Sequence, residues 1–472
     1  MNVGMENFLN SIDLLIFFGA IALVMAIGVL VGSREKTSED YFLAGKNIPW
    51  WGVAGSIFGS NISANHLVGM MGIGFGVGFA QSHFEIGAIA ALMLLCYGFL
   101  PVYRGLNILT LSEYLGKRYD ERSRLLYALI MVLIMVVVQM VPALYIGSRT
   151  TCILMGGEFI EQVERGGKIA LEVNYFYYVI VVISLALISA SYTILGGLKA
   201  VIWTDFLQSS LLLVAGFVLA VLTFNEIGGW SQLMALDRGG QGANKMHLYL
   251  PSHHRELPWT GVLTGLKAMD FYYWGTNQFI VQRALAARSD REARFGVIVA
   301  GFLKLTIPFI AIGTGVAAYY LFLEKLPERS IASDAAFSEL VKLVIPFGYG
   351  IVGLIAAGVM GAILSSIDSM MNSAATIVSV DIYQRYINPQ ASDRQMIRVG
   401  RSSIVGFVTL ATLMAILVLD PNSEGHFFLQ IVDYQGYLTP GLLVTFLLGI
   451  FWRRATGLGS FVTICVGIFY SW

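Results

Sequence analysis

The sequence predicts an all-helical integral membrane protein, and its composition and its long charge-free segments are the two observations that predict this class. The chain has 472 residues, of which 56% are hydrophobic and only 13% are charged, whereas soluble domains carry about 25% charged residues. A helix needs roughly 20 mainly apolar residues to cross a bilayer, and uncharged runs of about that length recur along the chain. Strands of a membrane barrel are shorter, about 10 residues, and alternate in polarity, which these runs do not.

These runs predict about twelve membrane-spanning helices. A twelfth, weaker segment from about Trp259 to Gln282 is interrupted by charged residues. The other eleven contain no charged residue and are Leu14 to Gly32, Asn47 to Phe84, Ile86 to Tyr103, Leu125 to Ser148, Val173 to Leu198, Phe206 to Asn225, Leu305 to Leu323, Leu343 to Ile367, Ser402 to Leu419, Tyr434 to Trp452 and Ala455 to Trp472. The last run only just reaches the length of a span. We therefore expect a truncated carboxyl terminus, with residues 454–472 as the start of a further, incomplete helix.

Lys and Arg are distributed unequally between alternate connections, which predicts the orientation of the chain. One set of connections holds nineteen of these residues and the other holds nine. Because cytoplasmic loops retain positive charge, the richer set is assigned to the inside and the amino terminus to the outside. Residues 1–13 contain no basic residue and no small-residue cleavage site, so the first run is expected to be a retained helix in a multi-pass protein of the cell membrane.

Several classes of function are disfavoured by what the sequence lacks. The chain has 30 basic and 30 acidic residues and no basic block, so the electrostatic pattern of nucleic-acid binding is missing. The three cysteines are far apart and match no metal-binding or disulfide spacing. No HExxH, GxSxG or Walker loop is present, so we expect neither an enzyme nor an ATP-driven transporter.

The second predicted span contains polar residues and glycines that a continuous lipid-facing helix would not have. Asn61, Ser63, Asn65 and His66 lie in its middle, and five glycines follow between Gly69 and Gly78. Non-helical backbone at membrane depth is tolerated where it lines a polar cavity or is covered by protein. Glycines alone would equally indicate close helix packing, but the polar cluster favours a broken helix.

The seventh predicted span shows the same anomaly. Lys267 and Asp270 are three residues apart, hence on one helical face, and Gly275-Thr276-Asn277 offers a break. An offset of five spans places the two interrupted segments in inverted orientations. Paired interrupted segments of this kind are the best sequence indication of a transport site.

The ninth predicted span carries a stripe of oxygen ligands. Ala362, Ser365, Asp368 and Ser369 recur at three- and four-residue spacing, and Ser366 lies beside them. Hydroxyl, carboxylate and carbonyl oxygens suit a hard cation such as sodium. The alternative is that the serines bond to their own helix and that Asp368 faces cytoplasmic water.

With these residues the sequence resembles the sodium:solute symporter family, in particular its sodium/sugar cotransporter branch. The resemblance covers nearly the whole chain from Tyr41 to Trp452, and its motifs are Asn61-Ile62-Ser63-Ala64, Tyr192 to Leu198 with Trp203-Thr204-Asp205, Tyr272-Tyr273-Trp274-Gly275 with Asn277-Gln278 and Gln282-Arg283, and Ser365-Ser366 with Asp381-Ile382-Tyr383. It implies one transporter domain with the LeuT-like five-plus-five inverted-repeat fold. Residues 1–45 would be an extra first helix and loop, 46–225 the first repeat and 255–453 the second.

The resemblance also implies the binding sites. The main sodium site would use the backbone carbonyls of Gly59, Ile62 and Ala362 and the hydroxyls of Ser365 and Ser366. A second sodium site, present in some relatives, would use Asp205, Asp368 and Ser369, although Asp205 could instead face cytoplasmic water. The organic substrate would contact His66, Glu85, Asp270, Asn277 and Lys304, and Tyr273 would close the site from the inside.

The substrate positions match those of sugar transporters only in part. His66, Ala88, Asp270 and Val432 stand where sugar transporters usually have other residues. The predicted function is sodium-coupled import of a small polar solute by alternating access, with a sugar, a polyol and a sugar acid all left open. Sodium is the coupling ion and no cofactor is expected; the other partners are the solute and the lipid bilayer, and the oligomeric state is left open. A proton-coupled symporter using His66, Asp205 or Asp368 and a non-transporting solute sensor are the alternatives.

Overall fold

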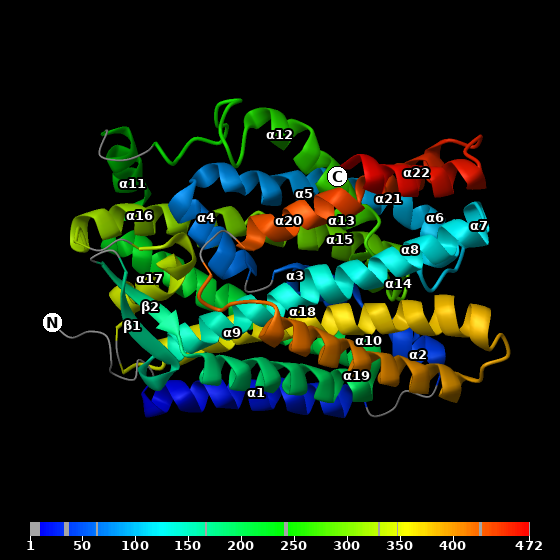
Figure 1. Cartoon of the computed structure of the whole chain (residues 1–472), viewed down its shortest axis with the longest axis horizontal. Coiled ribbons are helices and arrows are strands. Elements are labelled where there is room, and N and C mark those ends of the chain that lie inside the picture. The colour runs from blue at the N-terminus through cyan, green and yellow to red at the C-terminus, as the bar shows by residue number, and fades with distance from the viewer. Residues whose placement is uncertain are drawn as a thin grey trace.

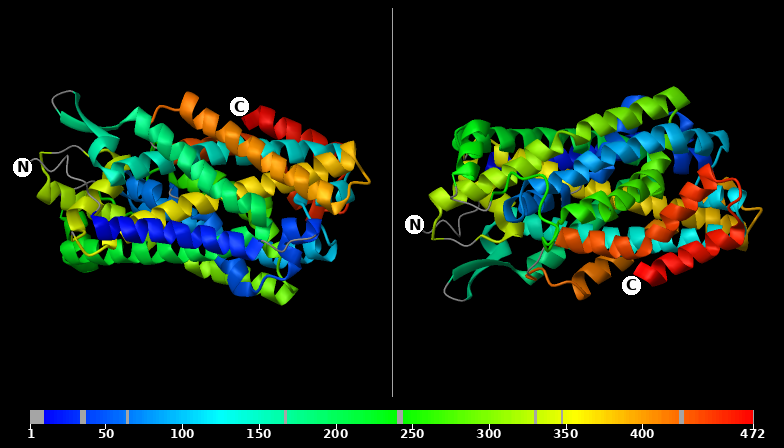
Figure 2. Two further views of the ribbon diagram at one scale, coloured as in Figure 1. Left: turned by 90° about the horizontal axis from the view of Figure 1, so that it is seen from below. Right: turned by 90° about the horizontal axis from the view of Figure 1, so that it is seen from above.

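A bundle of long helices makes up the protein, and most of them run along its longest axis (Figures 1 and 2). The computed structural model describes residues 10–32, 37–62, 65–165, 168–239, 244–328, 331–346, 348–423 and 427–471. The first helix, α1, lies at one side of the bundle and the last, α22, at the opposite side (Figure 1). The fold class predicted from the charge-free runs is therefore confirmed.

The helices of the first half, with the short 3-10 and π segments named η, are α1 (Ser11–Gly32), α2 (Ser38–Leu43), η1 (Ala44–Lys46), α3 (Trp50–Asn61), η2 (Asn65–Gly69), α4 (Met70–Gly76), η3 (Phe79–Ser82), α5 (His83–Leu94), η4 (Leu95–Phe99), α6 (Leu100–Gly105), α7 (Leu111–Arg118), α8 (Glu121–Leu133), η5 (Ile134–Met140), α9 (Val141–Met155), η6 (Gly157–Phe159), α10 (Tyr175–Glu226) and α11 (Gly229–Arg238). Those of the second half are α12 (Trp259–Leu263), α13 (Gly265–Gly275), α14 (Gln278–Leu285), α15 (Asp290–Lys304), η7 (Pro308–Gly313), α16 (Thr314–Lys325), η8 (Ser333–Ala335), α17 (Ala336–Val344), α18 (Ile351–Ile377), η9 (Val378–Ile387), α19 (Asp393–Leu417), α20 (Phe427–Leu438), α21 (Pro440–Phe451) and α22 (Gly457–Ser471).

Seven helices of the described residues are long and apolar enough to cross a membrane, and eight if the bent pair Gln430–Leu438 and Pro440–Phe451 forms one span. The remaining predicted spans are not counted as separate long helices, and the structure shows why. The second and seventh are interrupted, and the last is the 15-residue helix α22. The fifth and sixth together form α10, which has 52 residues.

Helix α10 contains two antiparallel spans that meet at Gly197. This glycine has φ 52° and ψ −149°, a conformation with positive φ that L side chains rarely adopt. Tyr192 and Thr204, on opposite sides of the turn, both flank Gly28 of α1, so the chain must fold back between them. The turn also packs tightly on α1, because a Cβ on Gly32 would lie 2.0 Å from the Cα of Gly196.

Both predicted helix breaks are present. Helix α3 ends at Asn61, Ile62 is extended, and the helical path resumes at Asn65, while Ser63 and Ala64 lie outside the described residues. Helix α13 ends at Gly275 and α14 begins at Gln278. One half of each interrupted span, α3 and α14, packs against the other, as an inverted repeat requires. The proposed repeat boundaries remain predictions.

One short sheet was not predicted. Strands β1 (Ile160–Arg165) and β2 (Lys168–Val173) form an antiparallel hairpin in which Ile160 pairs with Val173. The search for charge-free runs passes over this segment because its charged residues interrupt every apolar stretch. The hairpin and α11 lie at one end of the bundle, and α2, α6 and α7 lie at the other (Figure 1).

Candidate functional site

The end of α3 supplies the first two predicted sodium ligands. Gly59 lies in the last turn of α3 and Ile62 follows it, with φ −84° and ψ 90°. The carbonyls at the end of a helix lack regular helical partners, so this turn can direct oxygen atoms at an ion. A Cβ on Gly59 would lie 2.9 Å from the carbonyl oxygen of Asp205, and glycine therefore lets α3 approach α10 closely.

Helix α18 carries the other three predicted sodium ligands on one stripe. Ala362, Ser365 and Ser366 are all buried, and the Ser366 hydroxyl donates to the carbonyl oxygen of Ala362 at 3.1 Å. This bond is the back-bond from a helical serine to the carbonyl four residues earlier, which the sequence offered as the alternative to ion binding. The hydroxyl oxygen keeps lone pairs for a cation. These residues are therefore buried on one helix, and their role as sodium ligands remains a prediction.

Asp205 of α10 joins the two halves of this site. Its Oδ1 accepts a hydrogen bond from the Ser365 hydroxyl on α18. Its Oδ2 accepts from Ser56 at 2.6 Å and from Ser60 at 3.0 Å, both on α3. Asp205 is fully buried, so the alternative that it faces cytoplasmic water is wrong for this structure.

The residues predicted for a second sodium site meet at the same place. Asp368 accepts from the Tyr192 hydroxyl at 2.7 Å and from the Ser369 hydroxyl at 3.3 Å. The guanidinium of Arg283, from α14, reaches the same cluster: its Nη2 is 3.5 Å from Asp205 Oδ2 and donates to Ser369 Oγ. The cluster thus holds two buried carboxylates and one protein cation.

The second break positions tyrosine hydroxyls and the predicted gate. The carbonyls of Gly275 and Thr276, freed by the break, accept hydrogen bonds from Tyr103 at 3.2 Å and Tyr127 at 2.7 Å. Asn277 is buried, and neither of its amide atoms has a hydrogen-bond partner among the described residues. Tyr273, the predicted inner gate, accepts from Asn61 Nδ2 at 3.1 Å.

Three of the predicted substrate residues come together between the breaks. Lys304 Nζ lies 2.7 Å from Glu85 Oε2, and both side chains are at most 2% exposed. His66 Nε2 lies 4.0 Å from Glu85 Oε1. The same Lys304 ammonium donates to Asn61 Oδ1 and lies 4.7 Å from the centre of the Trp274 ring. The cluster combines polar groups with an aromatic surface.

Asp270 belongs to a neighbouring pair on α13. Its Oδ2 lies 3.5 Å from Lys267 Nζ, so the predicted shared helical face is confirmed. Asp270 packs against Gly87 of α5, where a Cβ would lie 2.1 Å from Asp270 Oδ2. Glu85 lies on the same helix two residues earlier.

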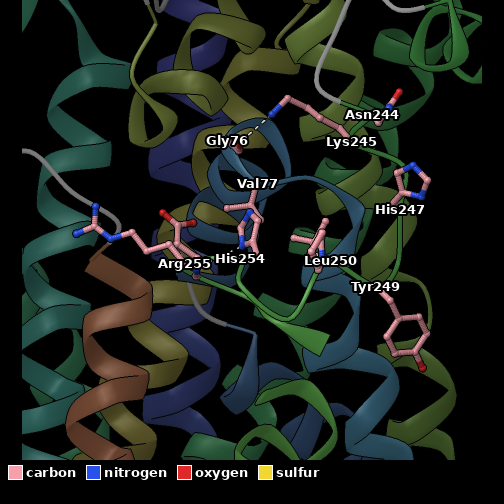
Figure 3. A pocket seen from close by; sticks show the side chains of 11 residues that line it. Gly76, Val77, Asn244, Lys245, His247, Tyr249, Leu250, His254 and Arg255 are labelled. Atoms are coloured by element: carbon pink, nitrogen blue, oxygen red, sulfur yellow. Dashed lines mark hydrogen bonds between the residues drawn. The ribbon is translucent and has the colours of Figure 1, made fainter. Parts of the chain in front are cut away.

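A cavity of about 620 Å³ lies beyond the carboxyl-terminal end of α4 (Figure 3). Its walls include Gly76, Lys245, Tyr249 and His254, and it contains none of the predicted substrate residues. Lys245 holds the loop to α4, because its Nζ donates to the Gly76 carbonyl at 2.6 Å and its own carbonyl accepts from Phe79 N at 2.6 Å. Burial lowers the pKa of Lys245 from its ordinary value of 10.5 to about 8.

A comparison with known families places this geometry in context. A model of the sodium:solute symporter family matches residues 41–467. The chain belongs to the sodium:solute symporter family. Members of this family couple solute import to sodium, and this chain is such a sodium-coupled transporter.

Two curated relatives and one solved structure illustrate the similarity. The chain is 32% identical to a sodium/glucose cotransporter of Vibrio parahaemolyticus, over 98% of this chain and 85% of the relative. It is 31% identical to sodium/myo-inositol cotransporter 2 of Bos taurus, over 97% and 68%. A substrate-bound, outward-open structure of a Na+-coupled sialic acid symporter superposes with a TM-score of 0.83 at 25% identity, covering 98% of this chain and 91% of that one. The LeuT-like fold is thereby confirmed.

Sequence reasoning missed four members of the site: Asn61, Trp274, Arg283 and Ser56. Asn61, Trp274 and Arg283 carried a signal, since all three stand in motifs singled out from the sequence. Arg283 is one of the nineteen basic residues that the sequence assigned to the inner connections, yet its side chain is fully buried. Ser56 lies in an apolar run with no signal beyond its polarity.

Proposed function

We propose that the protein imports a neutral, polyhydroxylated solute, a sugar or a polyol, together with sodium. Sodium binds to the carbonyls of Gly59, Ile62 and Ala362 and to the hydroxyls of Ser365 and Ser366. The observation that supports this arrangement is the position of Asp205, which contacts both the end of α3 and the stripe on α18. An ion between these elements would hold the broken span against α18.

The preference for a neutral solute follows from the charges around the breaks. Lys304 is paired with Glu85 at 2.7 Å, and Lys267 with Asp270 at 3.5 Å. A carboxylated solute would need a cation released from one of these pairs, which leaves a buried carboxylate uncompensated. A hydroxylated solute can hydrogen-bond to the same charged groups, to His66 and to Asn277 without breaking a pair, and its apolar face can lie on Trp274.

Binding measurements test this substrate class. The purified full-length protein is heated in sodium or choline chloride with glucose, galactose, myo-inositol, N-acetylneuraminate or proline. A ligand that binds the folded state raises the unfolding temperature by mass action. The proposal expects stabilisation by one of the neutral ligands only when sodium is present. Stabilisation by the sugar acid alone would contradict the neutral class.

A second coupling cation is supported by the charge balance at Asp205 and Asp368. One guanidinium faces two buried carboxylates, so a further sodium ion or a proton would complete the charge balance. The proton-coupled alternative therefore centres on Asp368 rather than on His66. Uptake driven by a pH gradient in sodium-free buffer, and lost in Asp368→Asn, would favour it.

The sensor alternative is distinguished by transport itself. A sensor would bind the solute with sodium but would not accumulate it in vesicles, whereas a symporter does both. Tyr273, bonded to Asn61 beside the first break, is proposed to move when the solute leaves toward the inside. Tyr273→Ala is expected to keep sodium-dependent binding and to lose sodium-driven accumulation.

We further propose that the protein lies in the cell membrane with its amino terminus outside. Most basic residues lie in the connections at the end that holds α2, α6 and α7 (Figure 1). Exposed positions at both ends allow a test with a membrane-impermeant maleimide on intact cells. Ser252→Cys is expected to be labelled and Gln390→Cys to be protected; the reverse pattern would invert the orientation.

A further inference from the structure

Arg283 links four elements that must separate if the cytoplasmic side of the transporter opens. It extends from α14, its Nε donates to Ser56 of α3 at 2.9 Å, and its Nη2 reaches Asp205 of α10 and Ser369 of α18. The side chain is fully buried. Helices α3 and α14 are the cytoplasmic halves of the two interrupted spans (Figure 1). Helix α18 packs against both of them, and α10 packs against α3.

Asp205 connects this arginine to the proposed main sodium site. One carboxylate oxygen, Oδ1, accepts the hydrogen bond of the sodium ligand Ser365. The other, Oδ2, binds Ser56, Ser60 and Arg283. A cation bound to the lone pair of Ser365 Oγ makes its hydroxyl a stronger donor, and charge-assisted hydrogen bonds are the stronger ones.

We propose that Arg283 is a cytoplasmic latch that ties sodium occupancy of the main site to closure of the inner side, through Ser365 and Asp205. Sodium binding strengthens the Ser365–Asp205 bond and fixes the carboxylate that holds Arg283. Loss of sodium loosens that carboxylate, and α3 and α14 then separate from α10 and α18. This inference rests on the proposed main sodium site.

The latch explains a feature of the site that ion binding alone leaves unexplained. A buried arginine beside two carboxylates is expensive to desolvate, and apolar replacements of such groups are often neutral or stabilising. Its presence at a junction of four helices fits a contact that is made in one state and broken in another. Such a contact supplies the state-dependent affinity that coupling requires.

The test follows hydrogen–deuterium exchange of the full-length protein in nanodiscs as sodium replaces choline. Peptides from α3 and α14 report on the inner side. In the wild type, sodium is expected to slow exchange in both peptides. In Arg283→Gln, half-maximal protection is expected to need on the order of tenfold more sodium, a size typical of coupling between two sites. In liposomes that carry this variant, sodium is also expected to leak across the membrane when no solute is present.

Arg124 provides a matched control. It forms another buried ion pair, with Nη2 2.8 Å from Asp381 Oδ1, between α8 and η9. Arg124→Gln is expected to lower thermal stability while sodium dependence stays that of the wild type. Ser56→Ala removes one latch contact without removing a charge, and it is expected to shift the sodium dependence in the same direction as Arg283→Gln but less.

Two results would overturn the latch while leaving the sodium site intact. They are a wild-type sodium dependence in Arg283→Gln, and an equal shift in Arg124→Gln. A wild-type protein that shows no response to sodium would instead overturn the sodium site and the latch together, so the two failures are distinguishable.

Discussion

The pair of Glu85 and Lys304 offers the most quantitative prediction. The two side chains are 2.7 Å apart and at most 2% exposed, and Lys304 also donates to Asn61 Oδ1. Lys304→Met keeps an unbranched apolar stem but removes the charge. It leaves Glu85 buried without its ion-pair partner and Asn61 without this donor.

The expected cost follows from these contacts. Removing one partner of a buried ion pair costs about 3–5 kcal/mol, because the other charge is left uncompensated. Lys304→Met should therefore lower the free energy of unfolding by about that amount. Adding Glu85→Gln removes the stranded charge, and the double variant should recover at least about 2 kcal/mol of the loss, since contacting residues are not additive.

Denaturant unfolding in mixed micelles, read out for the wild type, both single variants and the double variant, measures these differences. Lys267→Met serves as the matched control, because it breaks the Asp270 pair with a lysine that is 30% exposed; solvent screening should keep its cost near 1 kcal/mol or less. Solute binding should stay weak in the double variant even where stability returns. If Lys304→Met and the double variant are equally unstable, the stranded-charge reasoning is wrong.

Three other changes test separate parts of the structure. Ser365→Ala removes a proposed sodium ligand and should raise the sodium needed for half-maximal uptake on the order of tenfold, within the usual range of coupling energies. Ser184→Ala, whose hydroxyl donates to Ile180 O of its own helix, should leave it unchanged. Gly32→Val should lower the free energy of unfolding by about 1–3 kcal/mol through overpacking against the α10 turn, measured beside Gly19→Val, which has open space around it. Because the pKa of Lys245 falls to about 8 in the folded protein, the folded state binds fewer protons than the unfolded state between about pH 8 and 10.5, and stability relative to Lys245→Met should rise with pH across that window. A pH-independent difference between those two proteins would contradict the burial of Lys245.

The sequence predicted the elements that depend on local patterns. The charge-free runs located the spans, the three- and four-residue spacing located the stripe of Ser365 and Asp368, and Gly275-Thr276-Asn277 located the second break. Each of these signals lies within one segment, where periodicity and backbone preference decide the outcome.

The partners of these groups could not be predicted in the same way. Arg283 meets Asp205 across 78 residues, and Ser112 and Arg124 meet Asp381 across more than 250. Such contacts depend on how the helices pack, which no single segment encodes. The turn within α10 was predicted to within a few residues, because the charge-free runs end at Leu198 and resume at Phe206, and the structure places the turn at Gly197.

Uptake into proteoliposomes tests the central claim most directly. Liposomes carrying the full-length protein are given labelled myo-inositol, glucose or N-acetylneuraminate under an inward sodium gradient, with choline in place of sodium and Ser365→Ala as controls. The account predicts that a neutral solute accumulates above its external concentration only with the sodium gradient, and that Ser365→Ala needs more sodium to do so. Accumulation that is unchanged when choline replaces sodium would contradict it.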